Sequence, residues 1–139
     1  MKISLVWIIA VTLIVTAAVP VFAHHSFAAE FDATKPINVT GSLTKLDWIN
    51  PHARLFIDVK GSDGKIANWE IELGPPAILL RNGWTKNSVK AGDVLTVNGS
   101  LAKDGTNLAN ARTVTLADGT KVFAGSSAEN QTNQNQTNQ

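Results

Sequence analysis

The chain has 139 residues and no cysteine, and its 12 Lys and Arg residues against 11 Asp and Glu residues give a formal net charge of +1. This balance argues against a general nucleic-acid binder, which needs a basic face to neutralise phosphates, and against electrostatic docking to anionic lipid. The absence of cysteine excludes disulfides, thiol catalysis and cysteine-ligated metal sites, so a metal would have to bind through histidine, carboxylate or the terminal amine.

The first residues have the three parts of a secretory signal peptide. Lys2 supplies a positive charge, residues 3–16 form an almost unbroken apolar run, and residues 21–23 (Val-Phe-Ala) suit cleavage before His24. The alternative is an uncleaved membrane anchor, but the apolar run is short for a span of about 20 residues. We therefore expect residues 1–23 to be removed, leaving a periplasmic or secreted protein with no membrane attachment.

A lead-in segment is expected at residues 24–36. Phe27 and Phe31 lie four residues apart, which suits one helical turn packed on a domain. Pro36 is expected to end this turn, because proline disfavours helix in the residue before it. The folded domain is then predicted to occupy residues 37–125.

This domain is predicted to contain five main strands and one short helix, because turn-forming residues separate segments of alternating apolar and polar residues. In the first strand the alternation slips between Leu43 and Leu46, which predicts a β-bulge near Thr44 and Lys45. The strands are predicted at residues 37–49, 53–60, 66–73, 94–101 and 108–116, with the helix at 77–81 and a short extended piece at 121–123.

The element order β-β-β-α-β-β is that of the OB-fold, a partly open Greek-key barrel. We therefore predict an all-β fold, a small five-stranded OB-like barrel with one short helix between strands three and four. Another small barrel and an open sandwich are the alternatives. After the domain, residues 126–139 are polar and rich in Asn and Gln, and we expect them to form a disordered tail.

The three histidines are the clearest chemical signal. Cleavage before His24 would give that residue a free α-amine beside its imidazole, with His25 next to it, while His52 lies in the turn after the first strand. A terminal histidine offers its amine and Nδ1, and His25 or His52 would supply a third nitrogen. Such sites suit Cu(II), Ni(II) or Zn(II), with Cu(II) bound most strongly. The arrangement resembles the histidine brace of copper proteins, including copper-dependent oxygenases.

Structural roles explain the same residues without a metal. Two adjacent histidines at a terminus can form a solvated end, and His52 can cap a turn or pack on Trp48. The pair Glu70 and Glu72 loosely resembles two catalytic carboxylates, but the polar face of an amphipathic strand is expected to carry such residues.

Aromatic and basic residues offer a second kind of site. Trp48, Trp69 and Trp84 are candidates to line a ligand groove, although tryptophan packs in a core by default because it buries a large area. Arg54 follows His52 in the sequence and is a candidate to hold an anionic ligand or to pair with a glutamate.

Several sequence segments together resemble a bacterial exported family known as domain of unknown function 6152. They are residues 24–27 (HHSF), 30–32 (EFD), 48–52 (WINPH) and 83–84 (GW), with the later turns at 92–94 and 104–105. The resemblance covers nearly the whole mature domain and leaves the polar tail outside. It implies export and implies that the histidine segments belong to the family pattern, but it implies no reaction.

Three functions fit the sequence. The first is an exported metal-binding protein, with copper as cofactor and His24, His25 and His52 as ligands. The second is a non-enzymatic binding module for an envelope peptide, glycan or protein partner, using Trp48, Trp69, Trp84 and Arg54. The third is a copper oxidase-type enzyme. Binding is favoured over catalysis, because no Ser-His-Asp grouping, P-loop or dinucleotide motif is present. The sequence predicts no oligomeric state.

Overall fold

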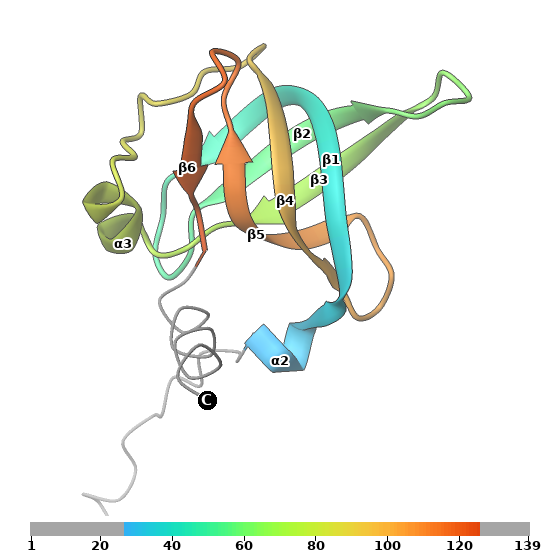
Figure 1. The fold of residues 1–139 in the computed structure, drawn as a ribbon, viewed down its shortest axis with the longest axis horizontal. Coiled ribbons are helices and arrows are strands. Elements are labelled where there is room, and N and C mark those ends of the chain that lie inside the picture. The colour runs from blue at the N-terminus through green and yellow to red at the C-terminus, as the bar shows by residue number, and fades with distance from the viewer. Residues whose placement is uncertain (1–26, 126–139) are drawn as a thin grey trace, which may run out of the picture.

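A computed structural model describes residues 27–125, which form six strands and two short helices (Figure 1). The elements are α2 (Phe27–Glu30), β1 (Phe31–Asp47), β2 (Arg54–Lys60), β3 (Ile66–Glu72), α3 (Pro76–Arg81), β4 (Val94–Ala102), β5 (Leu108–Thr115) and β6 (Lys121–Phe123). Neither helix of the described part is long and apolar enough to cross a membrane. The predicted signal peptide, His24, His25 and the predicted polar tail lie outside the described residues.

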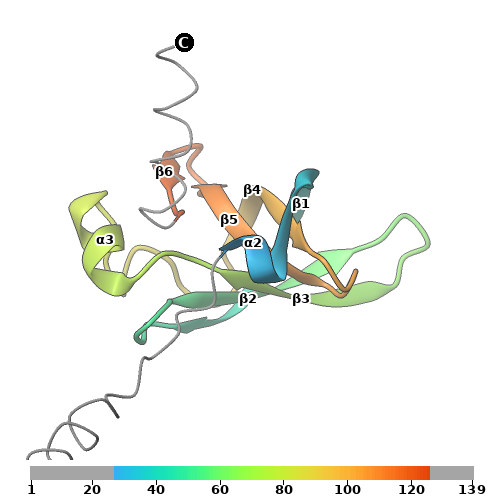
Figure 2. The same cartoon turned by 90° about the horizontal axis from the view of Figure 1, so that it is seen from below.

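Five of the strands close into a ring in the order β1-β2-β3-β5-β4. All pairings are antiparallel except the short contact between β3 and β5, which is parallel, and β6 pairs with β5. Figure 2 shows α3 and the β2–β3 hairpin projecting from opposite sides of the molecule. The mainly β, OB-like order with a helix between the third and fourth strands is confirmed.

The long strand β1 belongs to two parts of the ring. Its first part pairs with β4 and its last part pairs with β2, and Ser42 has a partner in both. Gly41 precedes this crossing, and a Cβ atom there would lie 2.7 Å from the carbonyl oxygen of Asp58, so only glycine permits the close approach. The register shifts between Leu43 and Lys45, which confirms the predicted β-bulge.

β1 begins earlier than the sequence predicted, at Phe31 instead of residue 37. In this part, β1 pairs only with β4 and is an edge of the sheet. Proline is tolerated at a sheet edge, where its missing N–H does not remove a hydrogen bond between central strands. Asp32 pairs with Leu101 and Pro36 with Ser100, so the register shifts and residues 33–35 of β1 have no partners in β4. The predicted helical turn is therefore confined to α2, and it ends at Glu30 instead of at Pro36.

The core fills the ring with apolar side chains from alternating positions. Leu55 and Ile57 of β2 face inward and are at most 1 % exposed, as strand geometry requires for residues two apart. Trp84, after α3, is also 1 % exposed, and its Nε1 donates a hydrogen bond to the carbonyl oxygen of Phe123 at 3.1 Å. The segment that follows α3 is thereby attached to β6.

We predict that Gly99→Ala strongly destabilises the fold. Gly99 lies at a register shift between β4 and β5, and an added Cβ would lie 2.0 Å from the carbonyl oxygen of Asn110. Because that neighbour is backbone, the strands must separate, and we expect unfolding free energy to fall by at least about 2 kcal/mol in chemical denaturation. Ser62→Ala, in the exposed β2–β3 turn, is the control. An unchanged denaturation midpoint for Gly99→Ala would contradict this packing.

Candidate functional site

The connection between β1 and β2 brings His52 to the end of β3. Ala53 donates a backbone hydrogen bond to Gly74 at 3.2 Å and accepts one from Leu73 at 2.8 Å. The preceding residue is thereby placed beside Glu72, and His52 Nδ1 lies 3.1 Å from Glu72 Oε1. The His52 side chain keeps 24 % of its surface exposed, whereas the Glu72 side chain keeps 11 %.

Glu72 has a second partner across the parallel contact. Its register partner in β5 is Asn110, and Asn110 Nδ2 donates to Glu72 Oε1 at 3.2 Å. Asn110 is only 4 % exposed, and its buried Oδ1 has no hydrogen-bond partner among the described residues. An unpaired buried acceptor costs about 1–3 kcal/mol, so one more donor would stabilise the His52–Glu72–Asn110 cluster.

His52 and Glu72 lie in an arrangement that also occurs around metal-binding histidines. Such histidines commonly donate their second ring N–H to a carboxylate, which fixes the tautomer and the ring orientation. Nδ1 of His52 is directed at Glu72, which leaves Nε2 as the nitrogen without this contact. Within residues 27–125 no group of three or more His, Cys, Asp and Glu side chains could hold a metal ion.

The beginning of the described chain is fastened to the β4–β5 connection. Phe31 is 2 % exposed, and its ring centroid lies 5.7 Å from that of Phe27. Lys103 donates its backbone N–H to the carbonyl oxygen of Glu30 at 2.9 Å and its Nζ to that of Ala28 at 2.6 Å. Phe31 is therefore buried in the domain and the ring of Phe27 contacts it, although the two residues lie in different elements, α2 and β1. The chain enters the domain from a fixed position.

The entering chain and Glu72 of the His52 cluster lie three strands apart in the ring. Phe31 pairs with Ala102 of β4, and two residues earlier in β4 Ser100 pairs with Asn110, the neighbour of Glu72. Three strand spacings amount to about 14 Å across the sheet, and the two-residue offset adds about 7 Å along β4. In Figure 1, α2 lies below the ring and the β1–β2 connection lies at its left side, beside α3.

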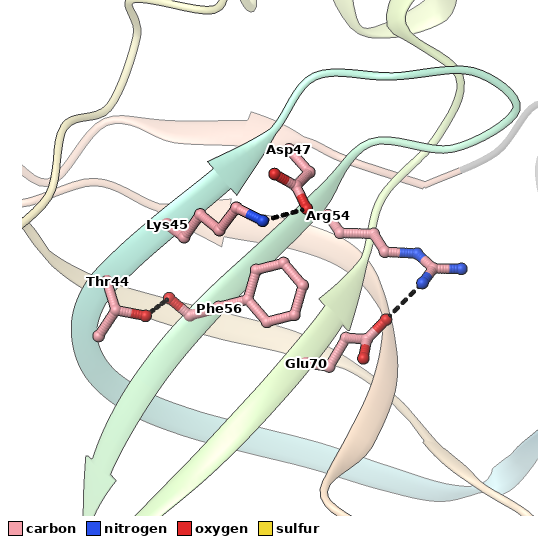
Figure 3. Close-up of polar contacts among 6 residues, drawn as sticks. All are labelled: Thr44, Lys45, Asp47, Arg54, Phe56 and Glu70. Atoms are coloured by element: carbon pink, nitrogen blue, oxygen red, sulfur yellow. Dashed lines mark hydrogen bonds and ion pairs between the residues drawn. The ribbon is translucent and has the colours of Figure 1, made fainter.

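A separate cleft lies on the outer face of β1, β2 and β3 and has a volume of about 680 Å³. We call it the Phe56 cleft, because the half-buried ring of Phe56 lies at its centre. Figure 3 shows this ring between two ion pairs, Lys45–Asp47 at 2.9 Å and Arg54–Glu70 at 2.7 Å. Lys45 Nζ also lies 5.3 Å from the ring centroid, within the range of a cation–π contact.

Polar groups surround the aromatic ring. Asn68 Nδ2 donates to Asp58 Oδ1 at 2.5 Å, which joins β3 to β2, and Thr44 Oγ1 donates to the carbonyl oxygen of Phe56 at 2.9 Å. Thr106 and Asn107 of the β4–β5 connection and Leu108 of β5 complete the lining. The cleft therefore presents the Phe56 ring among side chains that can donate and accept hydrogen bonds.

The residues predicted to bind a ligand occupy different places. Trp69 lines the cleft and also packs against the core, and Arg54 flanks the cleft through its ion pair with Glu70. Trp48 is half-buried and packs against the core at the β1–β2 connection. Trp84 lies inside the core, where its role is packing and a hydrogen bond to β6.

Sequence reasoning missed Phe56, although the sequence contains the signal. Leu55 and Ile57 both point inward, so the aromatic residue between them must point away from the core. An outward aromatic residue in the middle of a strand indicates a contact surface when polar residues surround it. The expected pairing of Arg54 with a glutamate is confirmed, and the partner is Glu70.

We predict that Thr106→Val raises the pKa of Asp104. The backbone N–H of Thr106 and then its hydroxyl donate to Asp104 Oδ1, at 2.9 and 2.8 Å, and these bonds hold the carboxyl pKa below its usual value. Because the folded pKa is lowered, this stabilisation is present above the unfolded pKa and is lost as pH falls through the folded pKa. Carboxyl-carbon NMR titration should therefore show a higher pKa for Asp104 in the variant.

The matched control is Thr120→Val, which alters an equivalent turn around Asp118 and should leave the pKa of Asp104 unchanged. An equal pKa for Asp104 in wild type and Thr106→Val would mean that the Thr106 hydroxyl does not stabilise the Asp104 carboxylate in the turn after β4.

Comparison with known proteins identifies the chain at the level of a family. A search of curated proteins finds no match. A family model matches residues 11–111, which include the HHSF and WINPH segments and run from before α2 into β5. This confirms the resemblance seen in the sequence, and the chain belongs to DUF6152, a family of unknown function.

Proposed function

We propose that the protein is exported, that cleavage before His24 creates its mature terminus, and that this form binds one transition metal ion. His24 supplies the α-amine and Nδ1, and His52 supplies Nε2. The observation that carries the proposal is the contact between His52 Nδ1 and Glu72 Oε1 at 3.1 Å, because a carboxylate in this position orients a histidine toward a metal.

Copper is the ion that this donor set favours. The site would contain nitrogen ligands without sulfur, since the chain has no cysteine. Among divalent first-row ions, Cu(II) binds nitrogen sites most strongly and prefers a square-planar or tetragonal arrangement of ligands. The α-amine and Nδ1 of one histidine would form a six-membered chelate ring with the ion. The partly buried Glu72 carboxylate would offset part of the positive charge brought by the ion.

The contacts that hold residues 28–31 on the domain support a role for the mature terminus in metal binding. His24 precedes Phe27 by three residues, which span at most about 10 Å when extended. Because Lys103 and the buried Phe31 hold the segment that follows, this short reach starts from a fixed point. In the ring, that point lies three strands from Glu72, the partner of His52. His25 is the alternative source of the remaining nitrogen.

We predict that the mature protein beginning at His24 binds one Cu(II) and that two changes weaken this binding independently. His52→Ala removes one imidazole, and acetylation of the His24 α-amine removes the terminal chelate. We expect each to raise the dissociation constant at least about tenfold in competition calorimetry. The acetylation should also change the nitrogen hyperfine pattern in electron paramagnetic resonance spectra.

A matched pair of glutamate variants tests the role of the cluster. Glu72→Gln removes the carboxylate beside His52 and should weaken Cu(II) binding about tenfold, whereas Glu70→Gln, on the same strand, alters only the pair with Arg54. Equal affinities for these two variants, or an affinity that His52→Ala leaves unchanged, would refute a site that includes His52.

The Phe56 cleft favours a second function, a non-enzymatic binding module for an envelope component. A cleft of about 680 Å³ is within the usual range of ligand sites, and Trp69 and Phe56 both contribute to its lining. This function does not depend on His52, because His52 is not among the described residues that line the cleft.

A further inference from the structure

We propose that the Phe56 cleft binds an uncharged oligosaccharide. The proposal rests on the second function, in which the protein is a binding module, and it names the class of ligand. The cleft combines an aromatic ring with planar polar side chains. Of its charged groups, Lys45 and Glu70 are in ion pairs, and Asp58 accepts a hydrogen bond from Asn68.

The centre of the cleft floor offers side chains. Phe56 of β2 pairs with Lys45 of β1 on one side and with Glu70 of β3 on the other. The backbone of Glu70 also donates to the carbonyl oxygen of Asn107 at 3.0 Å. Since peptide recognition by strand addition requires unpaired backbone groups, a ligand lying over Phe56 and Glu70 is recognised through side chains. Among the described residues, β3 has an edge without a strand partner only before Glu70, because it pairs with β5 at residues 70–72 alone.

The charges of the cleft disfavour an anionic ligand. One lining cation, Lys45, faces two lining carboxylates, Asp58 and Glu70, so the lining carries a net charge of −1. Arg54 neutralises Glu70 at 2.7 Å, while Asp47 holds Lys45 at 2.9 Å. A nucleic acid or an acidic polysaccharide needs an excess of basic groups, which this surface does not provide.

The remaining groups match a sugar ring. A pyranose has a face of C–H groups that can lie on an aromatic ring and a rim of hydroxyl groups that both donate and accept hydrogen bonds. Phe56 provides the apolar surface, while the joined Asp58 and Asn68 side chains provide adjacent acceptor and donor atoms. Thr106 and Asn107 lie at the wall on the β3 side, where a neighbouring sugar unit would contact them.

The test uses neutral tetrasaccharides of glucose, N-acetylglucosamine and mannose, with a heparin tetrasaccharide as the anionic comparison. Binding is followed by amide chemical shifts in two-dimensional NMR and by calorimetry on the mature chain. We expect at least one neutral sugar to bind, with shifts concentrated at residues 44–45, 56–58, 68–70 and 106–108.

The decisive variants are Phe56→Ala and Phe56→Leu. The second keeps an apolar side chain of similar bulk but removes the flat ring, so it protects the test against simple loss of folding. Each should weaken sugar binding at least about tenfold. The control is Leu80→Ala, which truncates a side chain that is 54 % exposed on α3, away from the cleft lining.

Three outcomes would overturn the proposal: no binding of any neutral sugar at millimolar concentration, unchanged affinity in Phe56→Leu, or stronger binding of heparin than of every neutral sugar. The same variants distinguish a failure of this proposal from a failure of the metal proposal. Copper binding should be normal in Phe56→Leu, and sugar binding should be normal in His52→Ala, because the two residues lie in different sites.

Discussion

The short parallel contact between β3 and β5 is the constraint on which both candidate sites depend. It joins residues 70–72 to residues 108–110 and closes the five-stranded ring. At one end of the contact it places Asn110 beside Glu72, which orients His52. At the other end it brings the β4–β5 connection against Glu70, where that connection forms a wall of the Phe56 cleft. A ring open at this point would lack the Asn110 contact of the first site and the β4–β5 wall of the second.

The two candidate sites also differ in burial and in whether their polar groups are paired. The His52–Glu72–Asn110 cluster is largely buried and contains an unpaired acceptor, so it can gain from an additional donor or cation. The Phe56 cleft is open, and two of its charged residues, Lys45 and Glu70, are held in ion pairs by residues beside it. One sheet thus supports a small, directional polar site at its end and a broad contact surface on its outer face. Since they share no side chain, each can be changed without altering the other.

Much of the fold could be predicted because alternation and turn residues are local signals. The bulge near Lys45 was predicted from the slip in alternation, and the strand order followed from the position of α3. The start of β1 was not predicted, because Pro36 argues against a strand in the sequence. The strand tolerates this proline only because it lies at the edge of the sheet there. The partnership of His52 with Glu72 was not predicted either, because it depends on backbone contacts between distant segments and on an asparagine 38 residues from the glutamate.

The central claim is that the mature terminus and His52 share one metal ion. The most direct measurement is the paramagnetic broadening that one equivalent of Cu(II) produces in the amide NMR spectrum of the mature protein. A shared ion predicts simultaneous broadening at the chain entry and around His52, Glu72 and Asn110, while the cleft residues near Phe56 stay sharp. Broadening restricted to the residues next to His24, with sharp signals around His52, would show that the ion binds the terminus alone and would contradict the claim.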